Sequence, residues 1–303
     1  MKKFFTTMAV LAAASALAIA QPPQGGRPQG GRPAGGGMPQ FRMPEKPSDP
    51  SFETKDVNMT SRGKLLYGLA VIPKDGPAKK PAIIMSHGYG GTGQGFWGQM
   101  TELGKAGYIC LALDLQGGGR MGSKSEGKTT EMSIFTEKEN LHDALNELKT
   151  WDCVDTDNIF LIGESQGGCI SALLAPEVQK EIKAICLVYP ALCIPDDARK
   201  IYKSKADIPD EVNFMGMNIG RAYYEPIYDF EIFDVIPAFE KDVLIVHGTN
   251  DQVVPISYSD KASKLYKNCE YHIIEGGGHG FFGEQKTACD KFVSDFLKKE
   301  LAK

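Results

Sequence analysis

Short apolar runs alternate with longer amphipathic stretches along residues 52–303, and this alternation is the main structural signal of the chain. Four of the runs are apolar almost throughout, which is typical of parallel strands that helices cover on both faces. The predicted strands are FETKDVNM (52–59), LLYGLAVIP (65–73), AIIMSH (82–87), YICLALD (108–114), IFLIG (159–163), AICLVYP (184–190), VLIVHG (243–248) and YHIIEG (271–276).

The stretches between these runs predict helices. In the stretch that begins near Thr136, Leu141, Leu145 and Leu148 recur at helical spacing and form one apolar stripe. The first two predicted strands are joined only by the short link TSRG, so we expect them to pair antiparallel. The remaining β-α-β order predicts an α/β fold with an eight-stranded, mostly parallel sheet and helices on both faces. The predicted helices cover residues 95–107, 136–151, 165–176, 257–268 and 284–301.

One segment, at about 191–234, interrupts the alternation of strands and helices. It is rich in aromatic residues and methionine, and it is too irregular for a single crossover helix. A long segment at the carboxyl edge of a sheet commonly forms a lid or the wall of a pocket. The pattern therefore predicts an inserted lid or pocket subdomain after the sixth strand.

The first fifty residues do not follow this pattern. Residues 1–20 combine two lysines, an Ala-rich apolar stretch and the small-x-small site Ala18-Ile19-Ala20, which predicts a secretory signal peptide. A membrane anchor is the alternative, although the apolar run is short for a span. Residues 21–50 repeat the unit QGGRP and offer almost nothing to a core, which predicts a flexible linker. Residues 51–303 then form the domain of an exported protein, periplasmic or secreted, with no stable membrane span in its mature chain.

Charge and cysteine content exclude some classes of function. The balance of 34 basic and 38 acidic residues shows no polyanion-binding signature, so nucleic acid is not an expected partner. The seven cysteines are odd in number and lie mostly within apolar runs, which favours buried free thiols over disulfides. Because the chain contains no C-x-x-C motif and no cluster of His and Cys, we expect no metal site.

The most informative motif follows the predicted strand IFLIG. Residues 163–167, Gly-Glu-Ser-Gln-Gly, match G-x-S-x-G between a strand and a helix. In such an elbow the serine lies on a tight strand-to-helix turn, and the flanking glycines leave room for that turn. A serine that only caps the helix is the alternative. The position after a buried strand favours Ser165 as a nucleophile.

A serine hydroxyl needs a general base at neutral pH. Among the five histidines, His279 lies in the glycine-rich loop EGGGHGFF after the last predicted strand, where an imidazole can reach the nucleophile. Asp251, in VLIVHGTNDQVVP, follows the preceding strand and is the predicted partner of the histidine. Asp196 and Asp197, after the sixth strand, are the alternatives for the acid. The order Ser165, Asp251, His279 is the order of α/β hydrolases.

The loop SHGYGGTGQG, residues 86–95, admits two interpretations. Its glycines, with Asp114 about twenty residues further on, fit a dinucleotide-binding fingerprint. Beside a serine nucleophile, the same loop can direct a backbone N–H toward the oxyanion of an acyl transfer. We favour the second interpretation, because the elbow, the acid and the histidine would otherwise be coincidences. The predicted oxyanion donors are then the backbone N–H groups of Tyr89 and Gln166, and Asp114 only ends a strand.

The segments SHGYGGTG, LALDLQGGGRMGSKSEG, IFLIGESQGG, VLIVHGTNDQVVP and YHIIEGGGHGFF, together with the insertion after LVYPA, match one family. Over these segments the chain, from about Phe52 to Lys303, resembles the bacterial feruloyl (cinnamoyl) esterases of the α/β-hydrolase superfamily. The resemblance implies hydrolysis of hydroxycinnamate esters of plant cell-wall polysaccharide, with no cofactor or metal. It implies the same triad and the same oxyanion donors as the motifs above.

The resemblance also assigns residues of the insertion. In these esterases the insertion binds the aromatic acyl group, and the matching positions imply that Asp197 and Tyr223 contact its phenolic hydroxyl. The correspondence leaves Asp196 or Tyr224 as alternatives. The chain departs from the family in two places. Glu164 stands before the nucleophile, where family members often have His, and the fourth predicted strand is followed by QGGGRMG.

The sequence thus predicts a serine esterase that acts on feruloyl or p-coumaroyl esters, either small or linked to a polysaccharide. An acetyl-xylan or general carboxylesterase of the same fold is the first alternative, and an exopeptidase-like serine hydrolase is the second. A catalytically silent protein of this fold that binds carbohydrate or a protein partner is the non-enzymatic alternative. Whether the protein forms a homodimer is left open by the sequence.

Overall fold

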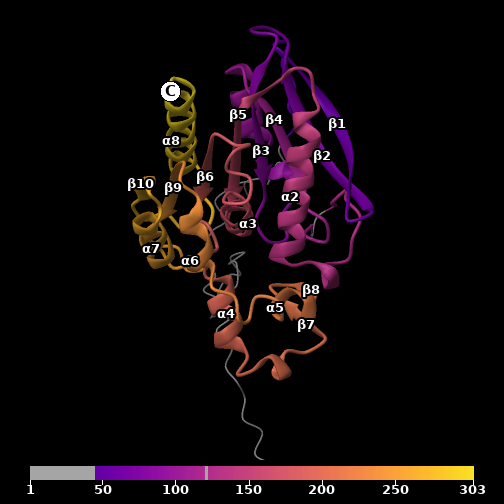
Figure 1. The fold of residues 1–303 in the computed structure, drawn as a ribbon, viewed down its shortest axis with the longest axis vertical. Helices are drawn as coiled ribbons and strands as arrows, with labels where there is room; N and C mark the ends of the chain where they lie inside the picture. Colours follow the sequence, from indigo (N-terminus) through magenta and orange to yellow (C-terminus); the bar gives the residue numbers. More distant parts are fainter. Residues whose placement is uncertain (1–44, 120–121) are drawn as a thin grey trace, which may run out of the picture. The chain divides into compact units, whose positions relative to one another are not determined.

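Eight strands form one sheet within residues 45–119 and 122–303, the part of the chain that the computed structural model describes (Figure 1). The strand order is β1-β2-β4-β3-β5-β6-β9-β10. β2 pairs antiparallel with β1 and with β4, and every other neighbouring pair in this sheet is parallel. The strands are β1 (Phe52–Ser61), β2 (Lys64–Pro73), β3 (Lys80–Ser86), β4 (Ile109–Asp114), β5 (Val154–Glu164), β6 (Ala184–Val188), β9 (Asp242–Gly248) and β10 (Asn268–Ile274).

This sheet confirms the predicted fold class, including the antiparallel start and the position of each predicted strand. The predicted signal peptide and the predicted linker up to residue 44 lie outside the described residues. No helix of the described residues is long and apolar enough to cross a membrane. All seven cysteines have free thiols, and five of them are buried.

Helices cover both faces of the sheet. Apolar residues of α2, α3 and α7 form a core on one face, and those of α1 and α8 form a second core on the other. The predicted stripe of Leu141, Leu145 and Leu148 is fully buried in the first core. The α-helices are α1 (Trp97–Lys105), α2 (Ile134–Lys149), α3 (Gln166–Leu174), α4 (Ile194–Ile201), α5 (Arg221–Tyr224), α6 (Ile232–Val235), α7 (Ser257–Leu265) and α8 (Glu284–Leu301), and the 3-10 helices are η1 (Gly93–Phe96), η2 (Thr129–Glu131), η3 (Lys205–Asp207) and η4 (Ile236–Ala238).

The start of α2 differs by two residues from the sequence prediction, for a local reason. The Ser133 hydroxyl accepts a hydrogen bond from the Thr136 N–H (3.2 Å), and the Thr136 hydroxyl accepts one from the Ser133 N–H (2.8 Å). This reciprocal capping satisfies backbone donors that the first helical turn leaves free. The helix therefore begins at Ile134, before the apolar periodicity becomes clear.

The chain leaves the sheet between β6 and β9, where the sequence predicts an insertion. This segment contains α4, the hairpin of β7 (Glu211–Phe214) and β8 (Met217–Gly220), and α5. Figure 1 shows the hairpin, α4 and α5 together at one end of the sheet. Met215 and Gly216, between the two strands, both have positive φ (48° and 79°), as the tightest hairpin turns require.

Candidate active site

Ser165 occupies the turn between β5 and α3 with a strained backbone. Its φ of 54° and ψ of −118° lie in a region that side-chain-bearing residues rarely adopt. The flanking glycines are required: a Cβ on Gly163 would lie 2.2 Å from the Gly167 carbonyl oxygen, and a Cβ on Gly167 would lie 1.9 Å from the Ser86 carbonyl oxygen. A hydrogen bond from the Ser165 N–H to the Val188 carbonyl (3.0 Å) fixes the turn to β6.

The predicted triad forms one hydrogen-bonded series, with His279 between Ser165 and Asp251. The Ser165 hydroxyl oxygen is 2.9 Å from His279 Nε2, and His279 Nδ1 is 2.8 Å from Asp251 Oδ2. The other carboxylate oxygen of Asp251 accepts the backbone N–H groups of Val253 (2.9 Å) and Val254 (2.8 Å). This is the geometry in which an acid orients a histidine toward a serine hydroxyl.

A second histidine supports the acid. His247, in β9, is fully buried, and its Nε2 lies 3.2 Å from Asp251 Oδ2 while its Nδ1 lies 2.7 Å from the Ser259 hydroxyl. Burial raises the pKa of Asp251, but the hydrogen bonds from His247, His279 and the Val254 N–H outweigh burial. The pKa of this carboxyl is therefore held well below its usual range, and Asp251 is an anion at neutral pH.

The loops that carry Asp251 and His279 are joined to each other. The Asn250 N–H donates to the Gly277 carbonyl (2.8 Å), and a Cβ on Gly248 would lie 2.2 Å from the same oxygen. The ring of Tyr189, which follows β6, packs against the His279 imidazole with 4.9 Å between ring centroids. These contacts fix the imidazole without using either of its nitrogens.

The glycine loop after β3 lies directly beside the nucleophile. A Cβ on Gly88 would lie 3.0 Å from the Cβ of Ser165, a tighter contact than most side chains make, so glycine suits this approach. His87 directs the loop, because its Nδ1 lies 2.8 Å from the Gly88 carbonyl and its Nε2 accepts the Leu115 N–H (3.0 Å). Burial lowers the pKa of His87, so this imidazole is neutral.

Asp114 does more than end a strand, which corrects the sequence-based expectation. Its carboxylate accepts the backbone N–H of Gly93 in the glycine loop (2.9 Å) and of Lys124 (2.9 Å). Both oxygens are thus used within the protein, and the side chain is buried. The acid that a dinucleotide fingerprint would direct at a ribose instead fixes the glycine loop.

The predicted oxyanion donors belong to Gln166, which follows Ser165, and to Tyr89, which follows Gly88. Gln166 is the first residue of α3, where backbone N–H groups have no partner within the helix. Tyr89 follows the glycine that approaches Ser165, and its hydroxyl donates to the Phe214 carbonyl of β7 (2.9 Å). The glycine loop is thereby fastened to the hairpin of the insertion.

The two residues that the resemblance assigned to the phenolic hydroxyl differ in their surroundings. Tyr223 is buried, and its hydroxyl donates to the side-chain oxygen of Gln166 (2.6 Å). Asp197 lies on the first turn of α4 with 41% of its side chain exposed, and it pairs with Lys200 (2.9 Å). Asp196, the alternative, accepts a hydrogen bond from the Tyr258 hydroxyl (2.7 Å). In the structure, Tyr223 thus contacts Gln166, the residue that follows the nucleophile, whereas Asp197 is paired with Lys200.

The sequence prediction missed Glu137. This residue of α2 is buried, and its Oε2 accepts a hydrogen bond from the Gln166 side-chain amide (2.6 Å). Burial raises the pKa of Glu137 to about 8, although the hydrogen bond from Gln166 lowers it. A signal was present in the sequence: Glu137 lies four residues before Leu141, so it falls on the apolar stripe of the helix.

The unusual QGGG segment has a steric explanation. A Cβ on Gly118 would lie 2.6 Å from Glu137 Oε1, and one on Gly117 would lie 2.6 Å from the Lys128 carbonyl oxygen. Gly117 also has a positive φ of 74°. The third glycine, Gly119, forms a parallel bridge with Gly90 of the glycine loop. The segment thus packs closely against both the glycine loop and the buried carboxyl.

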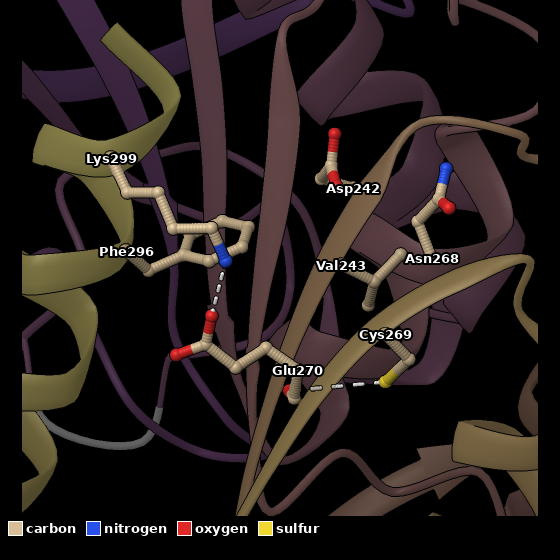
Figure 2. A pocket seen from close by; sticks show the side chains of 7 residues that line it. All are labelled: Asp242, Val243, Asn268, Cys269, Glu270, Phe296 and Lys299. Carbon is tan, nitrogen blue, oxygen red and sulfur yellow. Dashed lines mark hydrogen bonds and ion pairs between the residues drawn. The ribbon is translucent and has the colours of Figure 1, made fainter. Parts of the chain in front are cut away.

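A separate hollow of about 320 Å³ lies beside the start of β9 and β10 (Figure 2). Its charges are paired within the protein: Glu270 binds Lys299 (2.6 Å), and Asp242 binds Lys303 (3.0 Å). Because it lies where these strands begin, it is at the opposite edge of the sheet from the triad loops. The described residues contain no group of three or more His, Cys, Asp or Glu that could bind a metal ion.

Comparisons with known proteins agree with this architecture. Residues 77–213 match the family described as "Serine aminopeptidase, S33", and residues 231–301 match the family described as "TAP-like protein". The chain is similar to Est1E from Butyrivibrio proteoclasticus, solved with ferulic acid bound, at 29% identity and a TM-score of 0.75 over 82% of this chain and 100% of that chain.

Two further proteins are similar to this chain at lower sequence identity. Human monoacylglycerol lipase ABHD6 is 21% identical over 73% of this chain and 76% of that protein. An acetyl xylan esterase from Paenibacillus sp. R4 shares the fold, at 20% identity and a TM-score of 0.64 over 81% of this chain and 84% of that chain. With the sheet order and the two family matches, these likenesses identify the chain as a member of the α/β-hydrolase superfamily.

Proposed function

We propose that this chain is a serine esterase that hydrolyses hydroxycinnamate esters, such as feruloyl or p-coumaroyl groups on plant cell-wall polysaccharide. The observation that carries the proposal is the unbroken series of hydrogen bonds from Ser165 through His279 to Asp251. The strained backbone of the serine supports its role as a nucleophile. The likeness to Est1E, a protein solved with ferulic acid, supports the class of acyl group.

The proposed reaction is a two-step acyl transfer. His279 removes the proton of the Ser165 hydroxyl as the oxygen attacks the ester carbonyl, and Asp251 stabilises the imidazolium that forms. The N–H groups of Tyr89 and Gln166 donate to the oxyanion. The alcohol leaves with the proton, and a water molecule that His279 activates then releases the acid and restores the serine.

The aromatic end of the acyl group is proposed to bind against the insertion, with Asp197 and Tyr223 near its phenolic hydroxyl. The exposed ion pair of Asp197 with Lys200 contributes little stability, so a ligand can displace it. The Tyr223 hydroxyl already donates to Gln166, but its oxygen can still accept a hydrogen bond. The hydrogen bond from the Tyr223 hydroxyl to Gln166 occupies the proton that a phenol site would donate. A general carboxylesterase of broad acyl range is therefore the second candidate.

A substrate panel separates these candidates. We expect kcat/KM for methyl ferulate to exceed that for acetyl and butyryl esters, and we expect Ser165→Ala to retain less than a few per cent of turnover on all of them. A preference for acetyl or butyryl esters would favour the second candidate. Substantial turnover by Ser165→Ala would contradict both.

Tyr223→Phe tests the phenol site alone. If Tyr223 contacts the phenolic hydroxyl, the ratio of kcat/KM for methyl ferulate over methyl cinnamate falls in this variant. An unchanged ratio, with both values lowered together, would remove Tyr223 from the phenol site and leave it only its contact with Gln166.

Export is also proposed, on the pattern of residues 1–20. An esterase for wall polysaccharide needs access to a substrate outside the cytoplasm. Cell fractionation, with mass spectrometry of the mature N-terminus, is expected to find the chain in the periplasm or the medium and to begin it at Gln21. A full-length chain in the cytoplasm would contradict this.

A further inference from the structure

Behind the proposed oxyanion site lies a buried series of polar side chains that the reaction above does not use. The Tyr223 hydroxyl donates to Gln166 Oε1 (2.6 Å), and Gln166 Nε2 donates to Glu137 Oε2 (2.6 Å). All three residues are at most 3% exposed. The amide of Gln166 is therefore fixed at both ends, by α5 on one side and by α2 on the other.

The second carboxyl oxygen of Glu137 has an unusual environment. Glu137 Oε1 is buried and has no hydrogen-bond partner among the described residues. It lies close to the backbone of Gly118, where a Cβ would approach it to 2.6 Å. A buried carboxylate with one unsatisfied oxygen is strongly disfavoured. The carboxyl is therefore neutral at pH 7, in agreement with a pKa that burial raises to about 8.

The ionisable groups around Glu137 do not change their charge in the same pH range. On α3, burial raises the pKa of Cys169 well above its usual value, and on α5 burial raises the pKa of Tyr223 well above its usual value. After β3, burial lowers the pKa of His87. The Tyr89 ring lies beyond Tyr223, 6.0 Å away between centroids. Among these neighbours, Glu137 is the group that gains a charge between pH 7 and pH 9.

We propose that Glu137 is a positioning residue for the oxyanion site, and that its neutral carboxyl is required for full activity. The carboxyl fixes the side chain of Gln166, the residue whose backbone N–H is the proposed donor to the oxyanion. When Glu137 ionises, a negative charge forms behind the residue that must stabilise a second negative charge. The two charges repel in a low-dielectric environment, so the transition state is destabilised at alkaline pH. The inference rests on the proposed serine esterase reaction, but not on the identity of the acyl group.

The test is the pH dependence of kcat/KM for p-nitrophenyl acetate between pH 5.5 and 10, read at the isosbestic wavelength of the released phenol. In the wild type, kcat/KM is expected to fall about tenfold in the alkaline range, with a midpoint near pH 8. Glu137→Gln keeps a hydrogen-bond acceptor for Gln166 but cannot ionise, so it lacks this fall. Glu139→Gln, on the same helix with its side chain 56% exposed, serves as the control and keeps the fall.

Each outcome decides the inference. If the wild type is active and its alkaline fall persists in Glu137→Gln with the same midpoint, this inference alone is overturned, because another group would then be responsible. Wild-type protein that is folded but does not hydrolyse the ester overturns both the proposed function and this inference.

A second measurement applies if Glu137→Gln does not fold. Protein labelled with ¹³C at glutamate carboxyls, in a Glu164→Gln background, is expected to show one carboxyl resonance that titrates near pH 8. The background removes Glu164, whose pKa burial also raises. Absence of any carboxyl that titrates above pH 7 overturns the inference.

Discussion

Relief of backbone strain at Ser165 is expected to make Ser165→Gly more stable than Ser165→Ala. A side chain at φ 54° and ψ −118° costs about 1–3 kcal/mol, and glycine removes that cost. The greater freedom of glycine in the unfolded chain returns about 0.5–1 kcal/mol. Because both variants lose the hydrogen bond to His279, their difference isolates the Cβ. The glycine variant is therefore expected to be more stable by about 0.5–2 kcal/mol.

Urea unfolding of the two variants, followed by far-UV circular dichroism, measures this difference, and calorimetry should show a shift of a few degrees in Tm. The same pair of substitutions at Ser263, within α7, provides the control. There the glycine variant should be the less stable one, by about 0.5–1 kcal/mol, because the backbone is an ordinary helix. A Ser165→Gly variant no more stable than Ser165→Ala would refute the strained turn.

Three further predictions concern the surroundings of the nucleophile. Asp251→Asn should lower kcat by about 10³–10⁴-fold in ester hydrolysis, because an amide no longer selects the His279 tautomer that can accept the serine proton. Gly167→Ala should lower the free energy of unfolding by about 3 kcal/mol or more, since its Cβ would meet backbone at 1.9 Å, whereas Gly98→Ala, with open space around it, should be neutral or stabilising. The contribution of Glu137 to wild-type stability should fall as the pH rises from about 4.5 to 8, because the folded state alone keeps the Glu137 proton there; this loss, on the order of 5 kcal/mol at most, should be absent in Glu137→Gln when the pH dependences of the urea midpoints are compared.

The sheet could be predicted from the sequence because parallel strands that are buried on both faces leave continuous apolar runs. The meeting of Ser165, Asp251 and His279 at one site could be predicted for a related reason. Carboxyl ends of parallel strands meet at one edge of a sheet, so loops that follow different strands converge there. The 2.8 Å and 2.9 Å contacts of His279 are the result of this convergence.

The contacts that support the triad and the oxyanion site from behind could not be predicted, because they depend on packing between distant segments. Glu137 and Gln166 are 29 residues apart, and only the packing of α2 against α3 brings their side chains together. The role of His247 likewise depends on the direction of its ring toward Asp251 rather than on its place at the end of a strand. Resemblance placed Tyr223 near the site but did not give the direction of its hydroxyl, which donates to Gln166.

The central claim, that Ser165 is an activated nucleophile, is tested most directly by reaction with a fluorophosphonate probe and location of the label by mass spectrometry. The account predicts about one label per chain, on Ser165, with labelling lost in Ser165→Ala and strongly slowed in His279→Ala. A folded wild-type protein that takes up no probe, or that carries the label on another residue, would contradict the account.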